Sequence, residues 1–246
     1  MKIDINPLKT VMNIDSDEMF LTDPDTSCYR RLEFINEILD IGVDVGAHIG
    51  VMSIAMALRG FKKVYAFEPI KSNYDKLYNN ILGCEYQSII YPHRKAVWNK
   101  TGDELQFKRA GNTGQHSALY YQHHHQFSDF CQTISFVDMC KMIDQPIDYL
   151  KIDTEGAEYW IITPEKEVVK CLEEVKYIDI DLHEMDCKEF FDLKAFVKNN
   201  KYYPSAESAP GDLILLLMDI GFVPLLTDDT KGYLLRNNKR YPLVLT

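Results

Sequence analysis

Two glycines and one glutamate carry the first chemical signal in the sequence. Gly46 and Gly50 come directly after the short apolar run 41–45. A glycine at a strand end permits a tight turn and lets the backbone approach a ligand closely. Glu68 follows Gly46 by 22 positions, at the end of a second apolar run, where a carboxylate accepts hydrogen bonds from ribose hydroxyls. This order predicts a nucleoside-binding site. A plain tight turn, with Glu68 capping a helix beside Pro69, is the alternative.

The same turn lacks the glycine pattern of dinucleotide-binding proteins. That pattern, counted from Gly46, needs glycines where the chain has His48 and Val51. A helix start without a clean phosphate nest suits a nucleoside better than a pyrophosphate. A nicotinamide-dependent oxidoreductase is therefore the second enzymatic reading, and the missing pattern speaks against it.

Hydrophobic periodicity predicts the elements that must position these residues. Strands are expected at 41–45, 64–67, 88–91 (extending toward 97), 147–152 and 177–182, and helices at 29–39, 51–58, 72–80, 190–197 and 212–220. A hairpin arm is expected at 104–107, and a closing antiparallel hairpin at 222–227 and 232–236. Repeated strand–helix units predict an α/β fold, with a doubly wound, mostly parallel sheet and helices on both faces.

The chain reads as one domain with two less regular parts. Residues 1–40 are expected to form an N-terminal extension whose helix packs on a core of 41–246. Residues 110–130 are polar and irregular and are interpreted as a substrate lid loop. Three adjacent histidines, His123, His124 and His125, belong to this solvated loop, since regular structure cannot turn all three toward one metal ion.

Three segments together resemble the FkbM family of S-adenosylmethionine-dependent methyltransferases. They are 43–50 (VDVGAHIG), 66–69 (AFEP) and 149–158 (YLKIDTEGAE), of which the last is the most specific. The resemblance implies the seven-stranded class I methyltransferase sheet with a reversed last strand. It also implies S-adenosylmethionine as cofactor and O-methylation of a hydroxyl on a sugar, glycan or glycosylated metabolite.

Carried onto this chain, the resemblance implies a set of cofactor-binding residues. Gly46 and Gly50 would line the methionine and ribose, Asp44 would brace the turn, and Glu68 would hold the ribose hydroxyls. The full set is Asp44, Gly46, Ala47, His48, Gly50, Glu68, Pro69, Ala96, Val97 and Asp153.

The ends of the fourth and fifth strands are expected to supply the reacting groups. Methyl transfer is an in-line displacement that needs an aligned acceptor and a group to remove its proton. His183 is predicted as the general base, because an imidazole with a pKa of ~6.5 accepts a proton near neutral pH. Period-2 alternation puts Asp181 on the same face, where it would orient His183. Asp153 is the third catalytic candidate. A helix cap for Asp153 and a structural bond for His183 are the alternatives.

Other residues near these strand ends are candidates for substrate or metal contact. Glu155 and Glu158 fall in the first turn of a helix, where acids also favour the helix dipole, and Tyr120 and Tyr121 in the lid are placed to stack on a sugar. Some class I enzymes hold Mg²⁺ at these strand ends, so a metal site is an open alternative. Its ligands would be Asp153, Asp181 and Glu184.

Composition narrows the class of protein. The 246 residues carry a formal charge of −10, which disfavours binding to a nucleic-acid backbone. The start lacks the apolar core of a signal peptide, the run 213–218 is too short to span a bilayer, and the six cysteines are scattered. The expectation is a cytoplasmic enzyme with a small-molecule or glycan substrate, no nucleic acid and no membrane span. A methyltransferase-like module that binds a partner without chemistry is the third reading.

Overall fold

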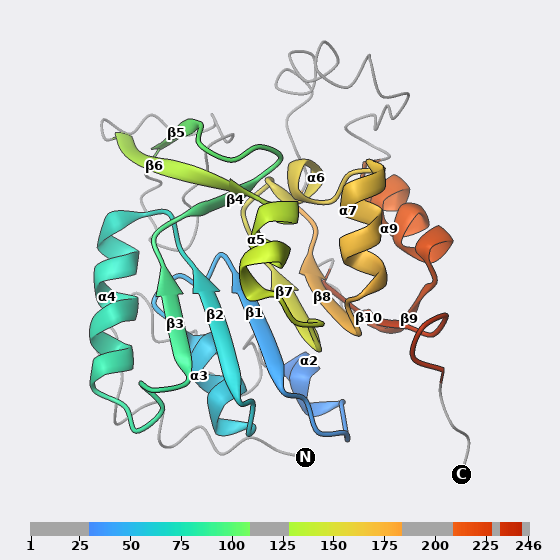
Figure 1. Ribbon diagram of the computed structural model, residues 1–246, viewed down its shortest axis with the longest axis horizontal. Coiled ribbons are helices and arrows are strands. Elements are labelled where there is room, and N and C mark those ends of the chain that lie inside the picture. The colour runs from blue at the N-terminus through green and yellow to red at the C-terminus, as the bar shows by residue number, and fades with distance from the viewer. Residues whose placement is uncertain (1–29, 109–127, 184–208, 228–231, 243–246) are drawn as a thin grey trace.

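A seven-stranded sheet forms the centre of the protein in the computed structural model, which describes residues 30–108, 128–183, 209–227 and 232–242. The strand order is β3-β2-β1-β7-β8-β10-β9 (Figure 1). In that order the strands are Ile90–His93, Lys63–Phe67, Ile41–Val45, Tyr149–Ile152, Tyr177–Asp181, Gly232–Asn237 and Phe222–Thr227. All neighbours are parallel except β10, which runs antiparallel to β8 and β9. The predicted α/β fold with its reversed closing hairpin is confirmed.

The strand order reverses direction at β1. From β1 the chain builds β2 and β3 on one side, and later β7 and β8 on the other. Ligands in such sheets bind where the order reverses, at the carboxyl ends of the strands. The sheet therefore brings the ends of β1, β2, β7 and β8 to one edge.

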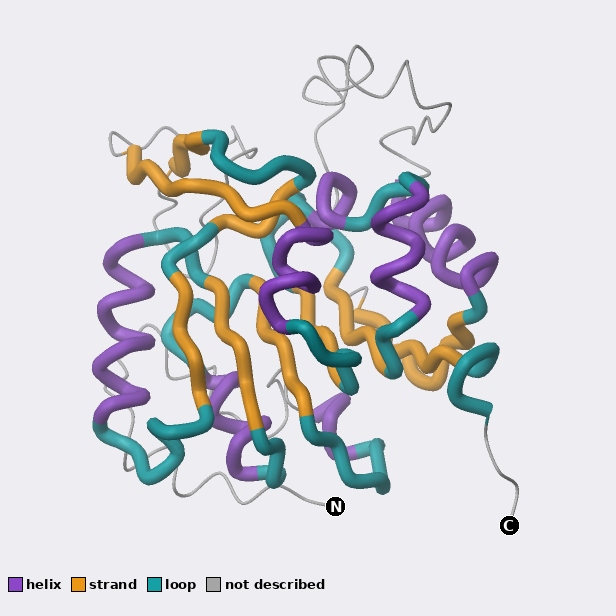
Figure 2. Tube along the Cα trace, in the orientation of Figure 1, coloured by secondary structure: helices purple, strands orange, loops and turns teal. Residues whose placement is uncertain are grey.

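Helices cover both faces of the sheet, as the two hydrophobic clusters require. One face packs against α5 (Phe136–Ile143), α7 (Lys166–Glu173) and α9 (Ala209–Ile220). The other packs against α2 (Arg30–Glu33), α3 (Val51–Leu58) and α4 (Lys71–Leu82). Figure 2 shows helices on both sides of the central strands. Strand β1 is buried throughout. Its Ile41, Val43 and Val45 belong to the first cluster, whereas Gly42 and Asp44 face α3 on the other side.

A second, three-stranded sheet lies beyond the carboxyl ends of β2 and β3 (Figure 1). It consists of β4 (Ala96–Trp98), β6 (Ser128–Ser135) and β5 (Glu104–Lys108), in that order. The expectation that the third strand extends toward 97 is wrong, because β4 pairs with β6 in the other sheet. The Arg94 guanidinium bonds Asp129 in β6 at 2.9 Å, which ties this sheet to the end of β3.

Several other expected helices and loops differ from those in the structure. The helix expected at 29–39 is only the four-residue α2, and β6, α5 and α7 were not expected. The helix expected to have Glu155 and Glu158 in its first turn is the short α6 (Glu158–Ile161), which begins at Glu158. Residues 128–130 of the expected lid belong to β6, whereas most of the lid, with Tyr120, Tyr121 and the three histidines, lies outside the described residues. The helix expected at 190–197 lies outside them too. Within the described parts of the chain, every helix is too short or too polar to cross a membrane.

Candidate active site

The turn after β1 is held in a conformation that demands its glycines. Gly46, His48 and Gly50 have positive φ angles of 85°, 51° and 95°. A Cβ added to Gly46 would lie 1.8 Å from the backbone oxygen of Asp153, and one on Gly50 would lie 2.6 Å from Leu77 Cδ1. Gly46 thus lets β1 and β7 approach at the reversal point, and Gly50 lets α3 pack against α4.

Glu68 joins the turns that follow β1 and β2. Its Oε2 accepts a hydrogen bond from the His48 N–H at 2.8 Å, and its Oε1 accepts one from the Ile70 N–H at 2.8 Å. Burial raises the pKa of Glu68 to about 8, although both backbone hydrogen bonds oppose the rise. The side chain of Asn73 is a third hydrogen-bond donor to this carboxylate. Because a carboxylate has about four lone-pair sites, one remains for a further donor such as a hydroxyl.

The pocket beside Glu68 has about 620 Å³ of empty space, part of it open to solvent. Seven of the predicted cofactor-binding residues line this pocket: Gly46, His48, Glu68, Pro69, Ala96, Val97 and Asp153. The other three, Asp44, Ala47 and Gly50, do not line it. Asp44 is buried and accepts a 2.6 Å hydrogen bond from Ser53 Oγ in α3, so it braces the strand–helix unit from within.

An apolar wall of the pocket comes from the second sheet and has no counterpart in the sequence analysis. Trp98 of β4 and Leu105 and Phe107 of β5 face the pocket. Trp98 also stacks on Trp160, with ring centroids 5.1 Å apart. The alternation at 104–107 indicated a strand, but no local pattern indicated which edge of the main sheet that strand covers.

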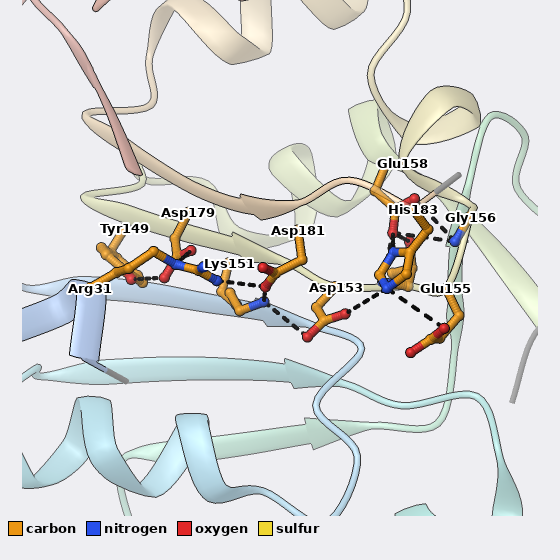
Figure 3. Close-up of polar contacts among 11 residues, drawn as sticks. Arg31, Tyr149, Lys151, Asp153, Glu155, Gly156, Glu158, Asp179, Asp181 and His183 are labelled. Carbon is orange, nitrogen blue, oxygen red and sulfur yellow. Dashed lines mark hydrogen bonds and ion pairs between the residues drawn. The ribbon is translucent and has the colours of Figure 1, made fainter. Parts of the chain in front are cut away.

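His183, just after β8, faces three carboxylates (Figure 3). Its Nδ1 lies 3.1 Å from Glu158 Oε1. Its Nε2 lies 3.6 Å from Glu155 Oε2 and 3.8 Å from Asp153 Oδ1. Asp153 and Glu155 also line the pocket, so Nε2 faces two residues of the pocket wall. The structure therefore brings together Asp153, Glu155 and His183, as the strand ends indicated.

The expectation that Asp181 orients His183 is wrong. Glu158 occupies that place, while Asp181 Oδ2 accepts hydrogen bonds from Lys151 at 2.5 Å and from Arg31 at 2.6 Å. These two cations hold the pKa of Asp181 at about 2, against the effect of burial. Alternation correctly put Asp179 and Asp181 on one face, but that face points to Arg31.

Glu158 is fully buried, which argues against the predicted substrate contact. Its Oε1 accepts hydrogen bonds from the N–H and the hydroxyl of Thr154, both at 2.9 Å, and its Oε2 accepts one from the Gly156 N–H at 3.0 Å. Glu155, between them, has a positive φ of 53°. Glu158 thus fixes the loop after β7 and the ring of His183 together.

The surrounding carboxylates favour the charged form of His183. Burial lowers its pKa, but the hydrogen bond that Nδ1 donates to Glu158 and the charges of Glu158, Asp153 and Glu155 outweigh it and raise the pKa to about 10. Burial also raises the pKa of Glu155 to about 7, against the pull of His183. The proton on Nε2 therefore lies between the imidazole ring and the carboxyl groups of Asp153 and Glu155. A positive charge nearby would lower the pKa of His183 and make this proton easier to remove.

The predicted magnesium ligands are not assembled around a metal position. The ammonium of Lys151 lies between Asp153 and Asp181, at 3.1 Å and 2.5 Å, so it supplies the positive charge there. Glu184 lies outside the described residues. Within the described residues, one group of three offers ligand atoms within 4.8 Å of one another, namely Asp153, Glu155 and His183.

Comparison with known proteins adds a family assignment. The model of the methyltransferase FkbM domain matches residues 44–204. No curated protein shows significant sequence similarity to the chain.

Solved structures with similar folds are distant in sequence. Methyltransferase FkbM from Methylobacillus flagellatus KT is 16% identical, with a TM-score of 0.49; the match covers 94% of this chain and 58% of that one, so this chain spans less than two thirds of its length. A putative RNA methyltransferase from Pyrococcus horikoshii is 13% identical over 94% of this chain and 95% of that chain, with a TM-score of 0.45. A putative tRNA (m1A22) methyltransferase from Streptococcus pneumoniae, in complex with S-adenosyl-L-methionine, is 15% identical over 85% of this chain and 69% of that chain, with a TM-score of 0.42.

The family model spans well over half of the chain and contains the turn after β1, Glu68, the loop after β7 and His183. The chain belongs to the FkbM methyltransferase domain family.

Proposed function

We propose that the protein transfers the methyl group of S-adenosylmethionine to a hydroxyl oxygen of a sugar, glycan or glycosylated metabolite. The observation that carries this proposal is the placement of two sites in one pocket. Glu68 lines one part of the pocket, and Asp153 and Glu155 line another part. These two carboxylates lie 3.8 Å and 3.6 Å from Nε2 of His183.

The donor half rests on Glu68 and the apolar wall. S-adenosylmethionine supplies an activated methyl group on a positively charged sulfur. Glu68 would accept a hydrogen bond from a ribose hydroxyl, and Val97, Trp98 and Phe107 would enclose the adenine. The sulfonium would then lie toward Gly46 and Asp153, near the carboxylates after β7.

The acceptor half rests on His183. Glu158 holds Nδ1, so Nε2 is the nitrogen that faces Asp153 and Glu155 at the pocket wall. A hydroxyl placed in line behind the methyl group would give its proton to Nε2 as the carbon–oxygen bond forms and the sulfur–carbon bond breaks, with S-adenosylhomocysteine as the leaving group. For this step Nε2 must be unprotonated, and the bound sulfonium favours that state because like charges repel. The carboxyl group of Glu155, which lines the pocket, would contact the acceptor.

A neutral acceptor fits the charges around the pocket. Asp153, Glu155 and Glu158 surround His183, and the whole chain carries −10. A polyanion such as an RNA backbone would be repelled. The loop 110–130, with Tyr120 and Tyr121, remains our candidate for the sugar-binding lid.

The test combines donor binding with turnover. S-adenosylhomocysteine should raise the melting temperature, and Glu68→Ala should remove that rise. With a panel of neutral sugars and glycosides, His183→Ala should lower kcat by ~10²-fold or more while S-adenosylhomocysteine binding persists. Equal turnover by His183→Ala would refute the general base. Binding of NADH in place of S-adenosylhomocysteine would favour an oxidoreductase, and donor binding without turnover would favour a binding module.

A further inference from the structure

A row of alternating charges runs through the sheet from α2 to the pocket (Figure 3). Arg31 Nε lies 2.6 Å from Asp179 Oδ1, and Arg31 Nη2 lies 2.6 Å from Asp181 Oδ2. Lys151 Nζ then joins Asp181 at 2.5 Å to Asp153 at 3.1 Å. Asp153 is the member of this row that lines the pocket.

The row lies largely inside the protein. Lys151 is 1% exposed, Asp179 is fully buried and Arg31 is 6% exposed. Burying a charge costs several kcal/mol unless well-placed partners compensate it. Each cation here contacts two carboxylates, so the buried charges are compensated. Apolar side chains of the same volume would often stabilise the core as well as these ion pairs do. The arrangement calls for a role other than packing.

The row ends by fixing one carboxylate at the pocket. Lys151 holds Asp153 Oδ2, which leaves Oδ1 facing Nε2 of His183. The Asp153 N–H also donates to the Val45 oxygen at 3.0 Å, so backbone and side chain are both restrained. Asp181, held by Arg31, in turn keeps Lys151 in place.

We propose that Lys151 is a positioning residue for methyl transfer, which sets the orientation of Asp153 beside His183, with Arg31 and Asp181 as its anchor. This inference rests on the proposed function. Asp153 Oδ1, held in place, stabilises the imidazolium that forms when Nε2 takes the proton of the acceptor. Without Lys151 the carboxylate turns away, and the charge on the ring loses a fixed partner.

Two variants separate positioning from a merely structural role. Lys151→Met should lower kcat by ~10²-fold, since small displacements at a reacting centre cost that much. The dissociation constant of S-adenosylhomocysteine should change little, because Glu68 and the apolar wall lie elsewhere in the pocket. Lys176→Met is the matched control. It breaks the 2.5 Å ion pair of Lys176 with Glu37, remote from His183, and should lower stability without changing kcat.

A double-variant cycle tests whether Lys151 acts through Asp153. If it does, Lys151→Met should lower kcat no further once Asp153→Asn is present. Wild-type kcat in Lys151→Met, or a full and independent loss in the double variant, would overturn the inference. If Lys151→Met does not fold, the charge-balanced Lys151→Met/Asp181→Asn variant carries the same criterion. A wild-type protein that neither binds S-adenosylhomocysteine nor turns over would instead overturn the proposed function, and this inference with it.

Discussion

Glu68 is the residue on which the donor half depends. Its carboxylate is buried and its pKa is raised to about 8 in the free protein, yet ribose hydroxyls bond best to the ionised form. A ligand that prefers the ionised form binds more tightly as the pH rises through that pKa. Binding of the cofactor therefore competes with protonation of Glu68.

We expect the affinity for S-adenosylhomocysteine to increase as the pH rises from about 6.5 to about 8.5, and then to level off. Glu68→Gln keeps the shape of the side chain but cannot ionise, so its binding should be weaker and independent of the ionisation of residue 68. Isothermal titration calorimetry across this pH range measures both. Binding by Glu68→Gln as tight as that of the wild type would contradict the role of Glu68.

The His183–Glu158 pair makes a second prediction at the residue scale. Only the unprotonated ring accepts a proton, and the pKa of His183 is about 10 in the free protein. The value of kcat/KM, which reports the free enzyme, should therefore rise with pH from neutrality toward about 10. In Glu158→Gln the rise should move to lower pH, because the hydrogen-bonded carboxylate that raises this pKa is gone.

Thr154→Val is the control for that shift. It removes the 2.9 Å hydrogen bond from the Thr154 hydroxyl to Glu158 and loosens the same loop. The Glu158 carboxylate stays beside Nδ1 of His183. Its pH profile should keep the position of the wild-type profile. A profile that stays in place in Glu158→Gln would show that the pair does not set the proton affinity of the base.

Sequence spacing predicted part of this site. Gly46 and Glu68 follow from strand ends and their order, and His183 from the end of β8. The partner of His183 was misassigned, because alternation along a strand places Asp181 but says nothing of the loop after β7. That loop turns through the positive φ of Glu155, which brings Glu158 under the ring.

At the scale of elements, the close approach of β1 and β7 is decided by Gly46. Gly46→Ala would place a Cβ 1.8 Å from the Asp153 oxygen, whereas Gly102→Ala, at a similar φ of 88°, would meet nothing within 4 Å. Both variants force a side chain into the left-handed region, which costs about 1–2 kcal/mol. Gly46→Ala should lose more unfolding free energy than Gly102→Ala, and S-adenosylhomocysteine binding as well.

Denaturant unfolding and calorimetry measure these two effects. Gly102→Ala should bind S-adenosylhomocysteine as the wild type does, because Gly102 does not line the pocket and a Cβ there meets nothing within 4 Å. Equal loss of stability in the two variants would mean that the β1–β7 contact relaxes at no cost, and that Gly46 is needed only for its φ angle.

Local periodicity predicted the elements that are continuous in sequence and failed for those that depend on distant pairing. The strand at 41–45 and the helix at 51–58 match β1 and α3, because apolar runs and glycines mark their ends. The second sheet was missed, since β4 pairs with β6 across some 30 positions of intervening chain. Its Trp98, Leu105 and Phe107 complete the pocket only through that pairing.

At the scale of the whole molecule, we consider whether the activity needs a divalent metal ion. The row of charges from Arg31 to Asp153 is relevant, because it places cations among the carboxylates of a chain with a net charge of −10. Lys151 already places a positive charge between the two strand-end carboxylates. We therefore expect turnover in excess EDTA to equal turnover without it. Loss of activity that Mg²⁺ restores would contradict this expectation and would direct attention to Asp153, Glu155 and His183.

The central claim is methyl transfer to oxygen, and the product tests it most directly. The protein should be incubated with S-adenosylmethionine carrying a ¹³C-labelled methyl group and a panel of neutral glycosides, and the products examined by NMR. The account predicts one S-adenosylhomocysteine for each O-methyl ether formed, with formation strongly reduced in His183→Ala. A label found on nitrogen, or a protein that fails to bind S-adenosylmethionine, would contradict it.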